Sequence, residues 1–280
     1  MKIKITTLSE NTAPTGIGQL AEHGLAFLIE AGEKSFMFDV GQGLALANNA
    51  ARMGADLKKI SSVVLSHGHY DHTGGLQALL DAGASFELIA HPDAFDDKIA
   101  MHPVHGFVPI GISYKKDYLE QKGVKIRLET GPAEITPGIT TTGEIPMKTD
   151  FEKIEPMLYI RKNGKEMPDP LADDQALVFD AAEGLVILLG CAHRGAINTA
   201  LHAMEITGKK KIHAIIGGLH LERAPETQIS KTVDALKELD PKIVGPAHCT
   251  GVRAAAPLLQ AFGGKTQFCN VGNIFQFDIA

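Results

Sequence analysis

One short stretch constrains this chain more than any other. Residues 66–75 read Ser-His-Gly-His-Tyr-Asp-His-Thr-Gly-Gly. The stretch follows the apolar, β-branched run 60–65, which predicts a buried strand, and precedes residues 76–82, whose apolar spacing predicts a helix. We therefore expect it on a loop at the C-terminal end of a strand, where α/β proteins usually place their functional sites.

The spacing within this stretch favours metal binding. His67 and His69 are two residues apart in an extended segment, so their side chains point to one side. Asp71 and His72 come where the chain turns into the helix, which directs them to a second position. Imidazole and carboxylate together suit zinc, iron or manganese better than calcium or magnesium. The alternative, a polar loop with coincidental histidines, fits poorly with four potential ligands in six residues.

Composition narrows the class of partner. The chain has 280 residues, of which 44% are hydrophobic and 21% charged, as in an ordinary globular protein, and we expect one domain over residues 1–280. Its net charge of −6, 6% aromatic content and lack of tryptophan argue against a nucleic-acid partner. No apolar run approaches the ~20 residues that span a bilayer. Three cysteines and no signal peptide predict a reducing cytoplasm.

The periodicity predicts strands first and then alternating helices and strands in each half of the chain, which fits two β-rich layers with helices outside. The predicted helices are 44–53, 76–82, 196–206, 227–239 and 252–262. The predicted strands are 2–8, 25–31, 35–40, 60–65, 86–90, 124–129, 139–143, 156–161, 175–180, 185–190, 212–216, 242–245 and 274–279. Between residues 93 and 122 the pattern weakens. We interpret this part as a segment inserted over the site, a lid, with a solvated surface loop as the alternative.

Further metal ligands are expected from the second half of the chain. Three histidines there each follow an apolar run, which places them at the sheet edge that carries residues 66–75. His220 is interpreted either as a ligand or as an acid that contacts the substrate. For His23, His202 and His213 we favour a structural role. The assignment that we prefer gives one ion His67, His69 and His193, and the other Asp71, His72 and His248.

The His-x-His-x-Asp-His pattern of residues 67–72 resembles the motif of the metallo-β-lactamase superfamily. That resemblance implies a four-layer αββα sandwich with one or two divalent transition-metal ions at one sheet edge, zinc before iron or manganese. Residues 190–195, 217–221 and 248–251 resemble one branch of the superfamily. This branch includes 7,8-dihydropterin-6-yl-methyl-4-(β-D-ribofuranosyl)aminobenzene 5′-phosphate synthases, and the resemblance covers nearly the whole chain.

The chain also departs from the superfamily pattern. Many members have an aspartate that bridges the metals after the strand at 185–190, where this chain has Cys191. Cys191 is either a thiolate ligand or a buried thiol. The usual upstream histidine has no clear counterpart, and Asp173 and Asp174 lie roughly there. Asp39, at a strand end, either orients a metal-bound histidine or caps a turn.

The leading functional hypothesis is a metallohydrolase that acts on a small anionic substrate, phosphorylated or carboxylated, through a metal-bound hydroxide. Asp71 would hold the hydroxide and the metal, and His220 or His248 would give a proton to the leaving group. Arg194 and Thr250 are candidates for binding the anion, with surface charge and helix capping as their alternative roles. A synthase-like transferase or lyase, a di-iron redox or sensing protein and a non-catalytic sensor are the competing hypotheses, and a homodimer is the expected assembly.

Overall fold

The computed structural model describes all residues from Met1 to Ala280 and contains three sheets. The first sheet has the spatial order β17 (Ile274–Asp278), β1 (Lys2–Ser9), β2 (Ala26–Ala31), β3 (Lys34–Phe38), β4 (Ile60–Val64), β5 (Glu87–Ala90) and β8 (Lys125–Leu128). The second has the order β16 (Ile243–Ala247), β15 (Ile212–Gly218), β14 (Gly184–Leu189), β13 (Ala176–Ala181), β10 (Ile139–Thr141) and β9 (Glu134–Thr136).

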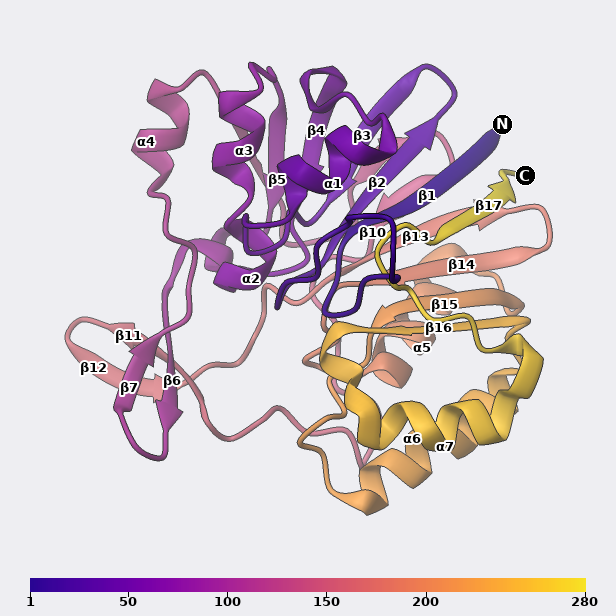
Figure 1. Cartoon of the computed structure of the whole chain (residues 1–280). Coiled ribbons are helices and arrows are strands. Elements are labelled where there is room, and N and C mark those ends of the chain that lie inside the picture. The colour runs from indigo at the N-terminus through magenta and orange to yellow at the C-terminus, as the bar shows by residue number, and fades with distance from the viewer.

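The two large sheets pack face to face, and helices cover their outer faces (Figure 1). A core between the sheets joins side chains such as Phe27 and Phe38 of the first sheet to Phe179 and Leu188 of the second. The helices over the first sheet are α1 (Leu46–Met53), α3 (Leu76–Asp81) and α4 (Lys116–Gln121). Those over the second are α5 (Ala196–Thr207), α6 (Glu226–Leu239) and α7 (Gly251–Phe262). This is the predicted αββα sandwich.

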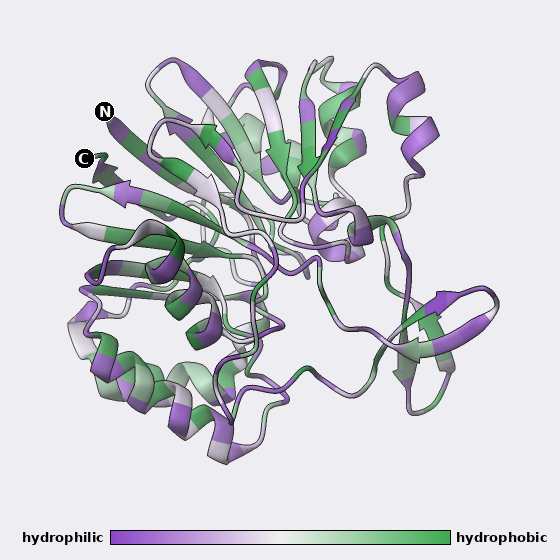
Figure 2. Ribbon diagram, turned by 180° about the vertical axis from the view of Figure 1, so that it is seen from behind, coloured by the Kyte–Doolittle hydropathy of each residue, from purple (hydrophilic) through white to green (hydrophobic).

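Hydropathy explains the layering. The strands of the two large sheets are strongly hydrophobic because both of their faces are covered, whereas the outer helices mix hydrophobic and hydrophilic residues (Figure 2). Strands β3, β4, β5 and β8 run parallel, as do β14, β15 and β16. Each parallel step needs a crossover, so the C-terminal ends of these strands meet at one edge. None of the helices is both long and apolar enough to cross a membrane.

The third sheet corrects the expectation for residues 93–122. This part of the chain forms a hairpin and the helix α4 rather than an irregular insertion. The hairpin pairs with a second one that starts after residue 157, and the resulting four-stranded sheet projects from the body of the protein (Figure 1). We call it the arm. Its strands are, in spatial order, β12 (Lys165–Pro168), β11 (Leu158–Lys162), β6 (Asp97–His102) and β7 (Gly106–Pro109).

Candidate metal centre

The loop after β4 forms a first group of donor atoms. His67 Nε2 lies 3.0 Å from His69 Nδ1 and 3.2 Å from Nε2 of His193, which stands after β14. All three residues are buried. His69 precedes the one-turn helix α2 (Tyr70–Thr73) in extended conformation, so the two histidines of the loop face the same side as predicted. These three imidazoles are the set that we expected to hold one ion, and the structure brings them together.

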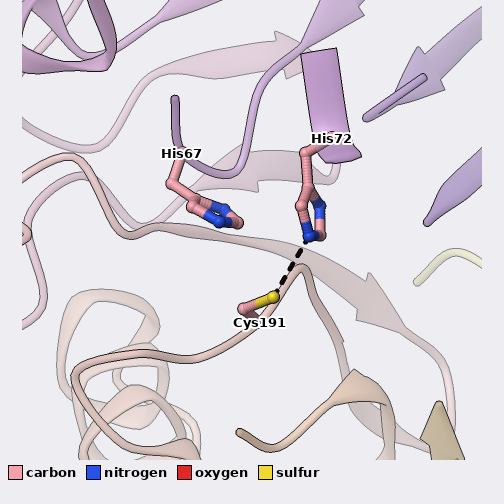
Figure 3. Close-up of side chains that lie close together, drawn as sticks. All are labelled: His67, His72 and Cys191. Atoms are coloured by element: carbon pink, nitrogen blue, oxygen red, sulfur yellow. Dashed lines mark hydrogen bonds between the residues drawn. The ribbon is translucent and has the colours of Figure 1, made fainter. Parts of the chain in front are cut away.

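A second group of donor atoms lies beside the first. Oδ2 of Asp71 is 3.1 Å from His248 Nε2 and 3.8 Å from His72 Nε2, and the two histidine nitrogens are 3.3 Å apart. Cys191 Sγ lies 3.1 Å from His72 Nε2 and turns toward it from the other side, with His67 alongside (Figure 3). The predicted set of three ligands therefore converges, and Cys191 is placed to join it.

Hydrogen bonds behind these rings decide which nitrogen faces the cluster. Asp39 Oδ2 accepts from Ser66 Oγ at 2.6 Å and from His72 Nδ1 at 2.6 Å. Because the Ser66 hydroxyl donates to Asp39, it accepts from His67 Nδ1 at 2.8 Å. In both imidazoles the proton is thus on Nδ1, and the Nε2 lone pair faces the donors of the cluster. The predicted orienting role of Asp39 agrees with this geometry.

The N-terminal loop holds His248 in the same way. His248 Nδ1 donates to Asn11 Oδ1 at 2.8 Å, and the backbone N–H of His248 donates to Glu10 Oε1 at 2.7 Å. His248 needs this support because its φ of +48° is in the left-handed region. Sequence reasoning missed both supporting residues. Their position directly after strand β1, where polar residues end an apolar alternation, was the available signal.

The two aspartates near the position of the usual upstream histidine hold loops and do not reach the cluster. Asp173 Oδ2 accepts from the backbone N–H of Gly68 at 2.8 Å, and its other oxygen is 2.9 Å from Lys98 Nζ. Asp174 Oδ2 accepts from the backbone N–H of Arg194 at 2.8 Å. Asp173 therefore fixes the loop that carries His67, and Asp174 fixes the loop that carries His193.

The structural role favoured for His23 is wrong. Its Nδ1 lies 3.6 Å from Asp71 Oδ2, and its ring centroid is 5.0 Å from that of His248, so it stands at the mouth of the second donor group. The loop before β2 carries it there, and no periodicity in that loop indicates the approach. His202 contacts the Thr142 carbonyl and His213 pairs with Glu183, both away from the cluster.

His220 lies beside the first donor group and has a carboxylate partner. Its ring centroid is 4.1 Å from that of His193, and its Nε2 is 3.0 Å from Glu155 Oε2. Its φ of +46° turns the side chain toward the cluster at the end of β15. Glu155 comes from the connector before the arm, which has no regular pattern, so sequence reasoning could not find it. His220 is outside the two predicted groups of three, but its ring nitrogen lies within 4.8 Å of donor atoms of Cys191 and His193, so its position fits both roles considered for it, ligand and acid.

The anion-binding roles predicted for Arg194 and Thr250 do not fit their surroundings. Arg194 Nη1 donates to the Pro170 carbonyl at 3.0 Å. Thr250 is 2% exposed, and its Oγ1 accepts from the backbone N–H of Leu219. Neither residue lines the cavity at the metal centre. Both side chains support loops, which is close to the alternative considered for them.

A cavity of about 630 Å³ opens in front of the two donor groups. One wall consists of the imidazoles and Asp71. The opposite wall comes from the arm and its base and is mostly apolar, with His102 of β6 as its polar residue. The inserted segment thus lies over the site, as expected. The apolar arm-side residues are Ala100, Met101, Val108, Ile110, Met157 and Leu158.

The residues present suit transition-metal ions. Burial lowers the pKa of His67 and His193 and brings that of His69 to about 3, so these rings are neutral and carry free lone pairs. Burial also opposes charge on His72, but Asp39 and Asp71 outweigh it and raise its pKa to about 9, so the second group attracts positive charge, and a metal ion would take the place of the proton on Nε2. His69 Nε2 and His193 Nδ1 are buried without hydrogen-bond partners.

Comparison with known proteins agrees with this geometry. The model of the metallo-β-lactamase superfamily matches residues 21–248. Over 98% of this chain and 97% of the relative, the sequence is 33% identical to 7,8-dihydropterin-6-methyl-4-(β-D-ribofuranosyl)-aminobenzene-5′-phosphate synthase of Methanocaldococcus jannaschii.

Solved structures show the same fold. The crystal structure of Tm1679, a metal-dependent hydrolase of the β-lactamase superfamily, superposes with a TM-score of 0.84 and 29% identity over 98% of both chains. Zn²⁺-bound PqqB from Methylobacterium extorquens, at 13% identity over 97% of this chain and 99% of its own, has a TM-score of 0.54 and is similar in fold alone. The chain belongs to the metallo-β-lactamase superfamily and has that superfamily's metal-dependent enzyme fold, in the branch that contains the M. jannaschii synthase.

Proposed function

We propose that the protein is a metallohydrolase that acts on a small anionic substrate at a two-metal centre. The observation that carries the proposal is the pair of adjacent donor groups facing one cavity. His67, His69 and His193 would hold one ion, and Asp71, His72 and His248 the other, with zinc preferred over iron and manganese. When bound, such ions polarise the attacked group and lower the pKa of a coordinated water.

The residues around the donors would supply the remaining chemistry. Asp71 lies in the second donor group and faces the cavity, so it would orient the attacking water through its carboxylate. His220 faces the same cavity and is held by Glu155, which makes it the proton donor for the leaving group. The apolar arm-side wall would exclude bulk water and pack against the uncharged part of the substrate.

The test is turnover by protein loaded separately with Zn²⁺, Mn²⁺ or, without oxygen, Fe²⁺. Aryl phosphodiesters, aryl phosphomonoesters and thioesters are offered as substrates. We expect turnover of at least one class, proportional to bound metal and lost in the Asp71→Asn and His220→Gln variants. His202→Gln is the matched control, because this histidine lies outside the cavity. The absence of turnover with every metal and substrate class would contradict the proposal.

A synthase-like reaction is the second candidate, because the M. jannaschii relative is 33% identical over nearly the full length of both chains. In that case the metal would act as a Lewis acid, and a bond would form to a pterin-like precursor without attack by water. Pyrophosphate release that depends on a reduced pterin, together with no hydrolysis of generic esters, would favour this candidate over the first.

A further inference from the structure

An anionic substrate needs a cationic partner, and the metal cavity offers few. Among the residues that line it, Arg223 is the one arginine or lysine. Arg223 stands at the rim, where Nη1 lies 3.4 Å from Glu155 Oε1 and the side chain is 72% exposed. The other side-chain charges on that rim are carboxylates, Glu155 and Glu222. Apart from the metal ions proposed above, further cationic side chains for such a substrate are therefore to be found beyond this cavity.

A second cavity of about 390 Å³ adjoins the first at Arg223. The two cavities share Glu155, His220 and Arg223 among their lining residues, so these three side chains form the boundary between them. The second cavity lies between the 151–156 connector and the start of α6, which follows β15. A ligand that reaches past the Glu155–His220 pair would thus have one end at the metal centre and the other here.

The second cavity is positively charged, in a protein whose net charge is −6. Lys153, Arg223 and Lys231 line it, and Glu155 is its only acid. Lys153 is exposed, so its ammonium group is accessible to a ligand that enters the cavity. Lys231 Nζ lies 3.6 Å from an oxygen of the exposed Asp150, a contact that solvent screens. Glu155 divides its charge between His220 and Arg223, so most of the positive charge is free for an anion.

We propose that the second cavity binds a phosphate monoester at the far end of the substrate, through Arg223, Lys153 and Lys231, while the reacting bond lies at the metal centre. The position of the reacting bond rests on the proposed function, whereas the anion site in the second cavity does not. A dianion suits three cations better than a carboxylate does, and the guanidinium of Arg223 can donate two parallel hydrogen bonds to it. Arg223 would thus have the anion-binding role that was predicted for Arg194.

The test is direct binding of benzylphosphonate, whose P–C bond a hydrolase does not cleave, to zinc-loaded protein by calorimetry and ³¹P NMR. We expect roughly tenfold weaker binding in Arg223→Ala, since a charge-assisted hydrogen bond is lost, and a further loss in Lys153→Ala/Lys231→Ala. Arg161→Ala is the matched control, because this exposed arginine on the arm lines neither cavity. Benzyl alcohol, which has no charge, should not bind measurably.

Two outcomes would overturn the inference. One is unchanged affinity when all three cationic side chains are replaced, and the other is binding that depends on zinc alone and is insensitive to Arg223. Neither outcome depends on turnover. If benzylphosphonate binds as expected but no ester is hydrolysed, the anion site stands and the hydrolase proposal fails. If esters are hydrolysed and the Arg223→Ala variant binds benzylphosphonate normally, the reverse holds.

Discussion

Replacing Lys98 by methionine should destabilise the protein more than any surface charge change. Lys98 is on β6, has a fully buried side chain, and its Nζ lies 2.8 Å from Asp169 and 2.9 Å from Asp173. Methionine preserves much of the volume but leaves two buried carboxylates without a counter-charge. Removing one partner of a buried ion pair costs about 3–5 kcal/mol of unfolding free energy. Total stability is of the order of 5–15 kcal/mol, so the loss would be easily measured.

The assay is urea unfolding followed by circular dichroism, because the chain has no tryptophan. The free energy of unfolding should fall with urea concentration by about 3 kcal/mol/M, so the midpoint of the urea transition should fall by about 1–2 M. Lys162→Met is the matched control. Lys162 is on β11 of the same arm, and its 2.8 Å contact with Asp96 is exposed, so its loss should cost less than about 1 kcal/mol. Equal midpoints for the two variants would refute the reasoning.

The contribution of the buried Lys98 ion pairs to the free energy of unfolding should depend on pH. Burial alone would lower the pKa of Lys98, but Asp173 and Asp169 outweigh it and hold the pKa above its ordinary value. A raised lysine pKa stabilises the folded state below the unfolded pKa, and this contribution is lost only as pH rises through the folded value. The difference between wild type and Lys98→Met should therefore persist up to about pH 9, below the ordinary lysine pKa, and should narrow at acid pH, where the buried Asp169 carboxyl, whose pKa burial raises, is protonated.

Three further substitutions test the metal centre and its loop. Asp39→Asn should weaken metal affinity by about 10–100-fold, measured by competition with a chromophoric chelator, because the bond that orients His72 is weakened; an unchanged affinity would contradict this role. Co²⁺-loaded protein should show a thiolate-to-cobalt absorption band that Cys191→Ser abolishes and Cys269→Ser, at a buried cysteine outside the cluster, retains. Cys249 is the other cysteine near the donors, so a band that survives Cys191→Ser and is lost in Cys249→Ser would show that Cys249, and not Cys191, is the ligand. Gly75→Ala should cost at least about 1–3 kcal/mol in urea unfolding, since its Cβ would overlap a backbone carbonyl oxygen, and a wild-type midpoint would refute that packing.

The sequence was sufficient for the two large sheets, apart from the short edge strand β9, because most of their strands are apolar runs with clear ends. Predicted and observed bounds of β4, for example, differ by a single residue, 60–65 against Ile60–Val64. The strand-end rule also placed His67, His193 and His248 correctly at one edge. Parallel strands in a sheet bring their C-terminal ends together, so metal-ligand residues that directly follow several such strands are predicted to lie close in space.

The strand predicted at 156–161 is β11, but the rest of the arm and the outer residues of the site were not predicted, for a different reason. Strands β11 and β12 meet at Asn163-Gly164, an Asn-Gly turn with both residues at positive φ, but β12 is exposed throughout and shows no apolar alternation. The pairing of β6 with β11 joins segments about sixty residues apart in the chain. Glu155 and His23 come from connectors whose path depends on such pairings. The local sequence therefore does not predict where these two side chains lie.

Backbone strain occurs at several turns of the sheet edge that carries the metal centre. Four non-glycine residues there have φ in the left-handed region: Asp39 at +56°, Ala192 at +55°, His220 at +46° and His248 at +48°. Glycine would adopt this conformation at no steric cost, whereas other residues lose about 1 kcal/mol or more. Three of the four side chains face the donor groups or orient them. The fourth, Ala192, lies between two residues that do. The conformational cost therefore falls where the side chain or its immediate neighbours form the metal centre. At His220 and His248, the sharp turn directs the ring away from its strand and into the shared cavity.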